Sequence, residues 1–462
     1  MADHAETRRI LSTAWDALGG PAELLDHVAF TQPGALDCHF AVADLAAGLM
    51  GAAGLAVAEL VTELGGPSPD VTVHRARAIA WFHTAIEPEG WEIPPFWHPL
   101  CADYRAADGW IRLHTNIPSH ARAVLEVLDV PSDPARVTAA VVRWTADDLE
   151  AAVLAAGGAA ARLRSRAEWL AHEQGRAVGG QALAAHSERT RTGSIRTPAG
   201  GARPLGGIRV LDLTRGVAGP VASRCLAAFG ADVLRIDPVD WEEPAVVPDV
   251  ALGKRRGRID LRAERGRAAL RALVSRADVV VHGYRPGALA WLALADEDHD
   301  FVPPGLVDVT LNAYGWAGPW VGRRGFDSLV QMSCGMAEEA MRAAGSDTPV
   351  HLPMQALDQG TGYLMAAAAV RALTERVRTG RGRRVHCSLA RTAEVLIEGP
   401  RRPDDGRLED RQSLFAAGEV VPTHWGAARR LPMPIEVAGS PMRWDVPAGP
   451  LGSHSPTWDE QP

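Results

Sequence analysis

Beyond residue 204, the hydrophobic positions alternate between two periods. Short apolar runs typical of buried strands are separated by stretches in which apolar residues recur at helical spacing. The predicted strands are Gly207–Thr214, Ala231–Asp237, Asp278–Tyr284 and Gly305–Gly315, and the predicted helices are Val221–Phe229 and Arg262–Ala277. This alternation predicts an α/β fold with a doubly wound parallel sheet. Ligands of such sheets bind at the carboxyl ends of the strands, so the loops there are candidate site segments.

The first part of the chain has a different pattern, with mostly helical spacing and one strand-like alternation at Gly109–Asn116. The predicted helices are Ala41–Leu64, Ser119–Leu128, Ala146–Ala161 and Arg166–Glu173. A polar stretch with Thr-Pro and Gly-Gly pairs then predicts a linker. We therefore expect a mostly helical α+β domain at 1–186, a linker at 187–204, the α/β domain at 205–396 and an irregular C-terminal tail at 397–462.

An internal repeat relates the two parts. The segment from Ala43 matches the segment from Leu357 without a gap, and it aligns Asp44 with Asp358. Both copies run from an acid through a glycine and an Ala-rich helix to glycines and a short strand, although shared Ala-richness can mimic part of this match. Asp44 is followed by LAAG where Asp358 is followed by QGTG. We interpret Asp44 as a structural helix N-cap.

Charge and composition exclude several classes of function. The net charge of -8 argues against a general nucleic-acid-binding protein. A local basic cluster, Lys254, Arg255, Arg256 and Arg258, suits one small anionic ligand. The five cysteines are scattered without a CxxC pair, which predicts neither a disulfide framework nor a zinc site. The N-terminus lacks the apolar core of a signal peptide, and the longest apolar stretches are short or interrupted, so we expect a cytoplasmic protein without a membrane span.

Asp358 is the main candidate for chemistry. It begins a strongly helical run that ends at Gly380. One interpretation is an N-cap, because Asp satisfies unpaired backbone donors at a helix start. The other is a nucleophile that the helix dipole keeps ionised, with Gly360 and Gly362 leaving room beside it for a thioester. Composition alone does not choose between them.

Five segments in this order resemble the family III CoA-transferases, which include formyl-CoA, carnitine-CoA and bile-acid-CoA transferases. They are PLGGIRVLDLTRGVAGPVASRCLAAFGADVLRID, GKRRGRIDLRAERGRAAL, ADVVVHGYRPGALAWL, YGWAGPWVGRRGFDSLVQMSCGM and ALDQGTGYLMAAAAVRALTERVRTGRGRRVHCSL. The resemblance implies a Rossmann-like CoA-binding domain with Asp358 as the catalytic carboxylate. It also implies a homodimer that acts on an acyl-CoA and a carboxylic acid, without a metal or a permanently bound cofactor.

The mechanism implied by this resemblance is acyl transfer through an aspartyl mixed anhydride and an aspartyl-CoA thioester on Asp358. Matching positions imply CoA contacts at Val217, Ala218, Lys254, Arg255, Tyr284 and Arg285, beside Gly360 and Gly362. Pro238, Trp291 and Gly283 depart from residues that the family commonly has there.

Two alternatives stay open. The α-methylacyl-CoA racemases of this family need a histidine where this chain has Phe326, and a phenylalanine cannot transfer the α-proton. The other alternative is a non-catalytic CoA-binding subunit. The segments before residue 187 resemble the small domain of the family and its exit helices, so the order of the domains looks rearranged.

Overall fold

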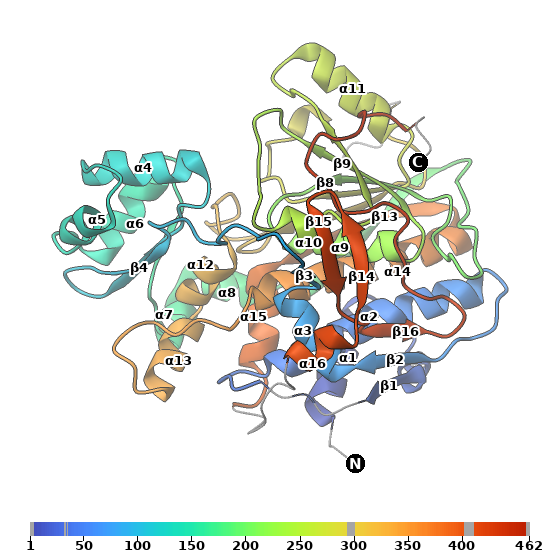
Figure 1. Cartoon of the computed structure of the whole chain (residues 1–462), viewed down its shortest axis with the longest axis horizontal. Coiled ribbons are helices and arrows are strands. Elements are labelled where there is room, and N and C mark those ends of the chain that lie inside the picture. Colours follow the sequence, from blue (N-terminus) through green and yellow to red (C-terminus); the bar gives the residue numbers. More distant parts are fainter. Residues whose placement is uncertain (1–3, 32–33, 35, 293–300, 402–410, 459–462) are drawn as a thin grey trace.

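The computed structural model describes residues 4–31, 34, 36–292, 301–401 and 411–458 (Figure 1). A seven-stranded sheet forms its centre, in the order β10-β9-β8-β11-β12-β13-β7. The strands are β7 (Ala184–Thr192), β8 (Arg209–Leu213), β9 (Asp232–Asp237), β10 (Lys254–Arg258), β11 (Val279–His282), β12 (Val307–Asn312) and β13 (Arg381–Ser388). All neighbours pair in parallel except β7, which is antiparallel to β13. The predicted parallel sheet is confirmed.

Helices cover both faces of this sheet because side chains alternate along each strand. Val210 and Val279 pack on the face covered by α9 (Ala218–Ala228) and α14 (Ala356–Thr379). Leu211 and Val280 pack on the other face, which carries α11 (Glu264–Val274). Figure 1 shows α11 across the sheet from α9 and α14. The strand order reverses between β8 and β11, where such sheets open a crevice at the carboxyl edge.

The N-terminal part supplies a second, smaller layer against α14. Its elements are α1 (Ala5–Ala17), a 3-10 turn η1 (Ala22–His27), β1 (Val28–Thr31), α2 (Val42–Glu63), β2 (Val71–His74) and α3 (Arg75–His83). The parallel neighbours β1 and β2 are connected by α2, as β12 and β13 are connected by α14. A further helix follows in each case, α3 or α15 (Leu389–Ile397). The two copies of the predicted repeat thus share one topology, and their long helices pack against each other.

Among the described residues, α2 is long and apolar enough to cross a membrane by length and composition. Of its most apolar stretch, 94% is buried inside the protein. Gly360 of α14 lies against Leu45 and Leu49 of α2. The composition of α2 is therefore explained by its place in the core, a position that allows few polar residues.

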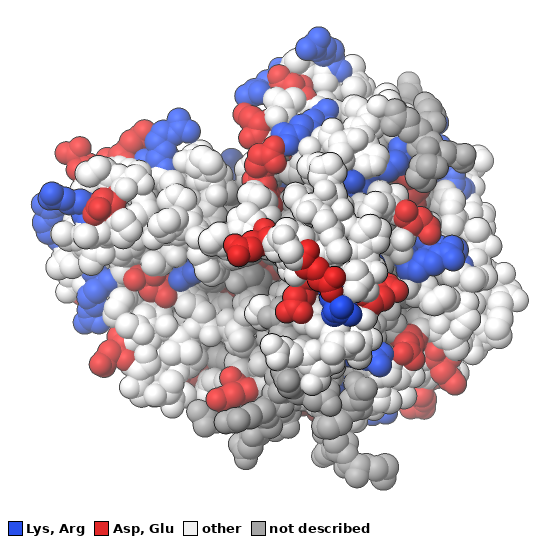
Figure 2. Space-filling model, viewed as in Figure 1, with Lys and Arg blue, Asp and Glu red and all other residues white. Residues whose placement is uncertain are grey.

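A small lobe lies to the left in Figure 1, and a notch separates it from the domain with α11 (Figure 2). It contains β4 (Ala102–Arg105), β5 (Trp110–Leu113), α4 (Pro118–Leu128), α5 (Pro134–Val141), α6 (Ala146–Ala155) and β6 (Ala160–Arg162). The predicted helix Ala146–Ala161 was too long. Gly157, at φ 84°, turns the chain after α6, and the last residues join β6. Helices α7 (Arg166–Ala171) and α8 (Glu173–Gly179) lead out of the lobe.

Two segment predictions need correction. The predicted linker 187–204 begins inside β7, whose residues pair with β13. The tail 397–462, predicted to be irregular, contains α16 (Arg411–Ala416), β14 (Glu419–Thr423), β15 (Gly426–Arg430) and β16 (Ile435–Val437). β15 pairs with β3 (Ile86–Pro88), and β16 pairs with β2. These strands are short and their partners are distant in sequence, so local periodicity does not reveal them.

The remaining short elements connect the larger ones. They are α10 (Val247–Val250), η2 (Ala290–Leu292), α12 (Asp327–Ser333) and α13 (Met336–Ala343). Of these, α12 bears directly on the candidate site.

Candidate active site

Asp358 lies in the first turn of α14, after the N-cap residue Gln355. Because α14 connects parallel strands, its first turn lies at the carboxyl edge of the sheet. The cap is provided by another carboxylate. Asp327 Oδ2 accepts the backbone N–H groups of Leu357 at 2.8 Å and Asp358 at 3.0 Å. The N-cap interpretation of Asp358 is therefore wrong, since Asp327 takes the bonds that a cap would make.

Asp327 is fixed by its own helix. Its Oδ1 accepts the side-chain amide of Gln331, and Gln331 Oε1 accepts the backbone N–H of Leu352 at 2.7 Å. The side chain of Asp327 is fully buried. Helix α12 thus holds the start of α14 in place, which leaves Asp358 without a capping role.

The electrostatics of this pair oppose ionisation. Burial, and then the negative charge of Asp327, raise the pKa of Asp358 well above the usual aspartate range. Burial also raises the pKa of Asp327. Within the described part of the chain, no hydrogen bond to the Asp358 carboxylate is found. Both effects oppose the ionisation that a helix dipole favours at this position. An ionised Asp358 is correspondingly more basic than a solvated carboxylate, which favours attack on a thioester.

The glycines beside Asp358 serve helix packing. A Cβ on Gly360 would lie 3.0 Å from Leu45 Cδ2, and one on Gly362 would lie 2.5 Å from the carbonyl oxygen of Ala218. The space beside both glycines is therefore filled by α2 and α9, and the prediction that they leave room for a thioester is wrong. Gly362 nevertheless brings the loop after β8 close to the first turns of α14.

Three of the predicted site loops meet at the carboxyl edge. Val217 is the N-cap of α9, and Ala218 is its first residue. The Arg215 guanidinium lies 4.6 Å from the ring centroid of Trp241, in the loop after β9, and 5.0 Å from that of Tyr284, in the loop after β11. Arg215 was not predicted. The carboxyl-edge rule identifies its loop, but only the fold places it between two aromatic rings.

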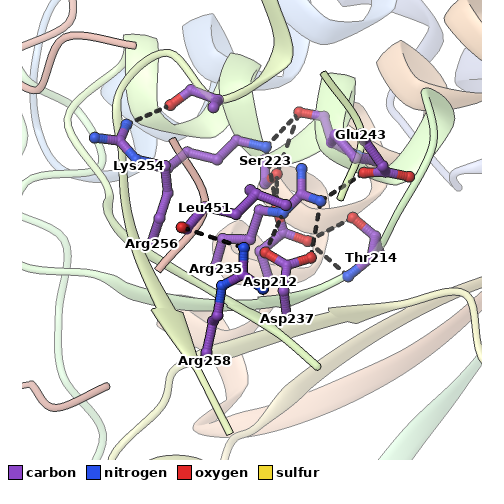
Figure 3. Close-up of polar contacts among 12 residues, drawn as sticks. Asp212, Thr214, Ser223, Arg235, Asp237, Glu243, Lys254, Arg256, Arg258 and Leu451 are labelled. Carbon is purple, nitrogen blue, oxygen red and sulfur yellow. Dashed lines mark hydrogen bonds and ion pairs between the residues drawn. The ribbon is translucent and has the colours of Figure 1, made fainter. Parts of the chain in front are cut away.

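The basic pair Lys254 and Arg255 has a structural role here. Lys254 is fully buried, and its Nζ donates to Asp212 Oδ2 at 3.0 Å and to the carbonyl of Pro220 at 2.8 Å (Figure 3). Burial lowers the pKa of Lys254 to about 8. Arg255 pairs with Asp232 at 2.9 Å and donates to the Thr457 carbonyl at 2.7 Å. The predicted contacts of this pair with CoA phosphate are therefore not supported.

The buried ion pairs and hydrogen bonds in Figure 3 hold the loop after β8 in place. Arg235 bonds both oxygens of Asp237 at 2.9 Å and Glu243 Oε2 at 2.7 Å. Glu243 Oε1 accepts the backbone N–H of Gly216 at 2.6 Å. Arg258 of the basic cluster instead bonds Glu242 and the carbonyls of Val239 and Leu451. The cluster predicted to bind an anion thus stabilises the framework around the candidate site.

The small lobe contacts the candidate site at Phe326, the residue before Asp327. The rings of His114 and Phe326 stack with centroids 3.7 Å apart, and the His120 ring lies 5.8 Å from that of Phe326. Arg285, predicted to contact CoA, is exposed at this side of the sheet. Among the described residues, no group of three His, Cys, Asp or Glu side chains is arranged to hold a metal ion.

The site thus consists of a parallel α/β sheet with a half-buried carboxylate, Asp358, at its carboxyl edge. Residues 205–400 match the model of CoA-transferase family III.

Two of the similar proteins bear the names of coenzyme A transferases. Acetyl-coenzyme A transferase nodX of Hypoxylon pulicicidum is 36% identical over 42% of this chain and 33% of its own length. Succinyl-CoA:glutarate CoA-transferase of Mus musculus is 30% identical over 50% of this chain and 56% of its own. A crystal structure of a hypothetical protein from Mycobacterium tuberculosis is 31% identical over 42% of this chain and 56% of its own, with a TM-score of 0.36. The chain thus spans about half, or less, of the length of these relatives.

Proposed function

We propose that this protein is an acyl-CoA:carboxylate CoA-transferase with Asp358 as its nucleophile. The observation that carries this proposal is the position of Asp358 in the first turn of α14, where Asp327 has taken over the cap. The carboxylate thus has no structural bond to lose when it reacts. The family match of residues 205–400 supports CoA thioesters as substrates.

In the proposed first half-reaction, an Asp358 carboxylate oxygen attacks the thioester carbonyl carbon. The C–S bond breaks, so CoA leaves as a thiolate and a mixed anhydride remains. The thiolate then attacks the aspartyl carbonyl of this anhydride. The donor acid leaves as a carboxylate, and Asp358 now carries CoA as a thioester.

The second half-reaction reverses these steps with the acceptor acid. The acceptor carboxylate attacks the aspartyl thioester and releases the thiolate, which gives a new anhydride. The thiolate attacks the acceptor carbonyl, and Asp358 leaves as a free carboxylate. Neither water nor a net proton is consumed, so a site that limits access of water to Asp358 suits the reaction.

Two features bear on the alternative functions. The internal bonds of Lys254 and Arg255 are compatible with a non-catalytic CoA-binding subunit. Phe326 has no proton to transfer, which argues against a racemase. We also propose a homodimer, supported only by the resemblance. A cytoplasmic location is supported by the five unpaired cysteines, Cys38, Cys101, Cys225, Cys334 and Cys387.

Trapping the intermediate tests the proposal. The protein is incubated with a panel of acyl-CoA thioesters and hydroxylamine, and mass spectrometry locates any hydroxamate. We expect the label on Asp358, its loss in Asp358→Asn and its retention in Asp347→Asn, an exposed carboxylate before the same helix. CoA binding without any hydroxamate across the panel would overturn the transferase and leave the non-catalytic subunit.

A further inference from the structure

The segment between α13 and α14 contains a strained residue close to Asp358. Met354 has φ 64°, a left-handed conformation that residues other than glycine rarely adopt. The next residue along the chain, Gln355, is the N-cap of α14. Such a conformation persists only where the surrounding structure holds it, and it is often found at functional sites. The contacts that hold this segment therefore affect how Asp358 is presented.

Helix α12 holds this segment on both sides of the strained residue. Before that residue, Leu352 donates its backbone N–H to Gln331 Oε1 at 2.7 Å, and the Gln331 amide donates to Asp327 Oδ1. After it, Asp327 Oδ2 accepts the first N–H groups of α14, including that of Asp358 at 3.0 Å. The side chains of Gln331 and Asp327 are both buried. One continuous set of hydrogen bonds thus joins the two ends of the segment.

The small lobe holds the same segment through His351, the residue before Leu352. Its Nε2–H donates to Asp103 Oδ2 of β4 at 2.9 Å, and Arg112 of β5 donates to the other oxygen of Asp103 at 3.0 Å. Against the effect of burial, the bonds to His351 and Arg112 hold the pKa of Asp103 below its usual value. Asp103 is therefore an anion that accepts a charge-assisted bond from His351.

His351 also lies within electrostatic reach of the cap. Burial comes first and raises the pKa of Asp327, whereas its hydrogen bonds and the positive charge of His351 act in the opposite direction. The imidazole thus lies near the carboxylate that fixes the first turn of α14.

We propose that His351 is a positioning residue for Asp358. Its bond to Asp103 anchors the segment before α14 to the small lobe, which keeps Met354 in its strained conformation and Asp327 on the first N–H groups of α14. His351 therefore acts through Asp327. This inference rests on the proposed function, and it gives the N-terminal half of the chain a part in presenting the nucleophile.

Rates of hydroxamate labelling test the inference, with the acyl-CoA of the panel that labels Asp358 most strongly. We expect His351→Leu to lower the labelling rate at saturating acyl-CoA about 10- to 100-fold, as for a misplaced reacting group, and to leave the half-saturating concentration unchanged. His351→Gln, whose amide can still donate to Asp103, should restore most of the rate. His74→Leu is the matched control and should change neither value, because His74 makes a comparable bond of 2.7 Å to Glu436 between β2 and β16.

Hydrogen exchange provides a measurement that needs no chemistry. In His351→Leu, the peptide that begins α14 should exchange about tenfold faster, because the cap by Asp327 opens more often. His351→Gln and His74→Leu should exchange as the wild type does. If His351→Leu does not fold, Asp103→Asn weakens the same bond from the other side and should change the rate of labelling and the exchange in the same directions.

The possible results separate the two proposals. If Asp358 is labelled and His351→Leu reacts as fast as the wild type, His351 does not position Asp358, and the transferase stands without it. If His351→Gln is impaired as much as His351→Leu, the bond to Asp103 is not the cause and the inference is likewise overturned. If no acyl-CoA labels Asp358, the transferase fails and hydrogen exchange decides, since faster exchange in His351→Leu supports the anchor and unchanged exchange refutes it.

Discussion

The internal repeat provides two aligned aspartates whose replacement should change stability in opposite directions. Asp44 is buried, its Oδ1 accepts Thr7 Oγ1 at 2.5 Å, and both of its oxygens bond the Arg75 guanidinium. No side-chain cap bond is found at the start of α2, so the predicted N-cap role of Asp44 is wrong and the ion pair is its role. Asp44→Asn leaves the Arg75 charge buried without its counter-charge. We expect a loss of about 3–5 kcal/mol in the free energy of unfolding.

Asp358→Asn removes an unfavourable charge instead. The folded-state pKa of Asp358 lies above its unfolded value, so between the two values the folded chain binds more protons than the unfolded chain. Its contribution to stability is therefore lost as pH rises from about 4 through the folded pKa, at about 1.4 kcal/mol for each unit between the two values. Asp358→Asn should be at least as stable as the wild type at pH 7, and the difference should shrink as pH falls.

Chemical denaturation of the wild type and both variants, repeated between pH 5 and 8, measures these differences. Hydroxamate labelling of the same samples separates stability from function: Asp44→Asn, assayed under conditions in which it is folded, should retain the Asp358 label. Equal destabilisation by the two replacements would show that Asp358 has a structural partner. It would refute the argument that Asp358 makes no structural bond and is free to react as a nucleophile.

Three further expectations follow from the site. The proposed acyl transfer requires ionised Asp358, so kcat/KM should fall on acidification at a pH well above the usual aspartate range, and a flat profile down to pH 5 would contradict the raised pKa. Gly362→Ala should lower the thermal unfolding temperature, because overpacking against a backbone carbonyl costs about 1–3 kcal/mol and outweighs a helix-propensity gain of about 1 kcal/mol. Gly360→Ala, which meets flexible leucine ends, should be milder by the same measurement. Arg255→Ala should reduce stability by about 1 kcal/mol and leave KM for acyl-CoA unchanged, whereas a tenfold rise in KM would restore its predicted phosphate contact.

The sheet could be predicted from the sequence because its signal is local. Apolar runs bounded by turns gave β8, β9, β11 and β12 to within a few residues. The edge strand β7 was not predicted because it lies in a polar segment. It pairs with one neighbouring strand, β13, and its sequence does not show the apolar alternation of a buried strand. The tail strands were missed because their partners lie near the other end of the chain.

The sequence indicated which segments meet at the candidate site better than it indicated their contacts. Motif order indicated Asp358, and the carboxyl-edge rule indicated the loops that carry Val217, Ala218 and Tyr284. The cap by Asp327 was not visible, because it joins residues that only the fold brings together. A charge run gives no information about the acids on neighbouring strands, so the burial of Lys254 against Asp212 could not be foreseen.

The packing of α2 against α14 has a consequence for synthesis. Leu45 and Leu49 contact Gly360, which leaves the ribosome roughly 300 residues later, a delay of about 15–60 s at 5–20 residues per second. During that interval α2, whose most apolar stretch is 94% buried in the folded protein, lacks one of the helices that bury it. A chaperone that binds nascent apolar segments should therefore be recovered on ribosome-bound chains that end before α14, and released once α14 has emerged.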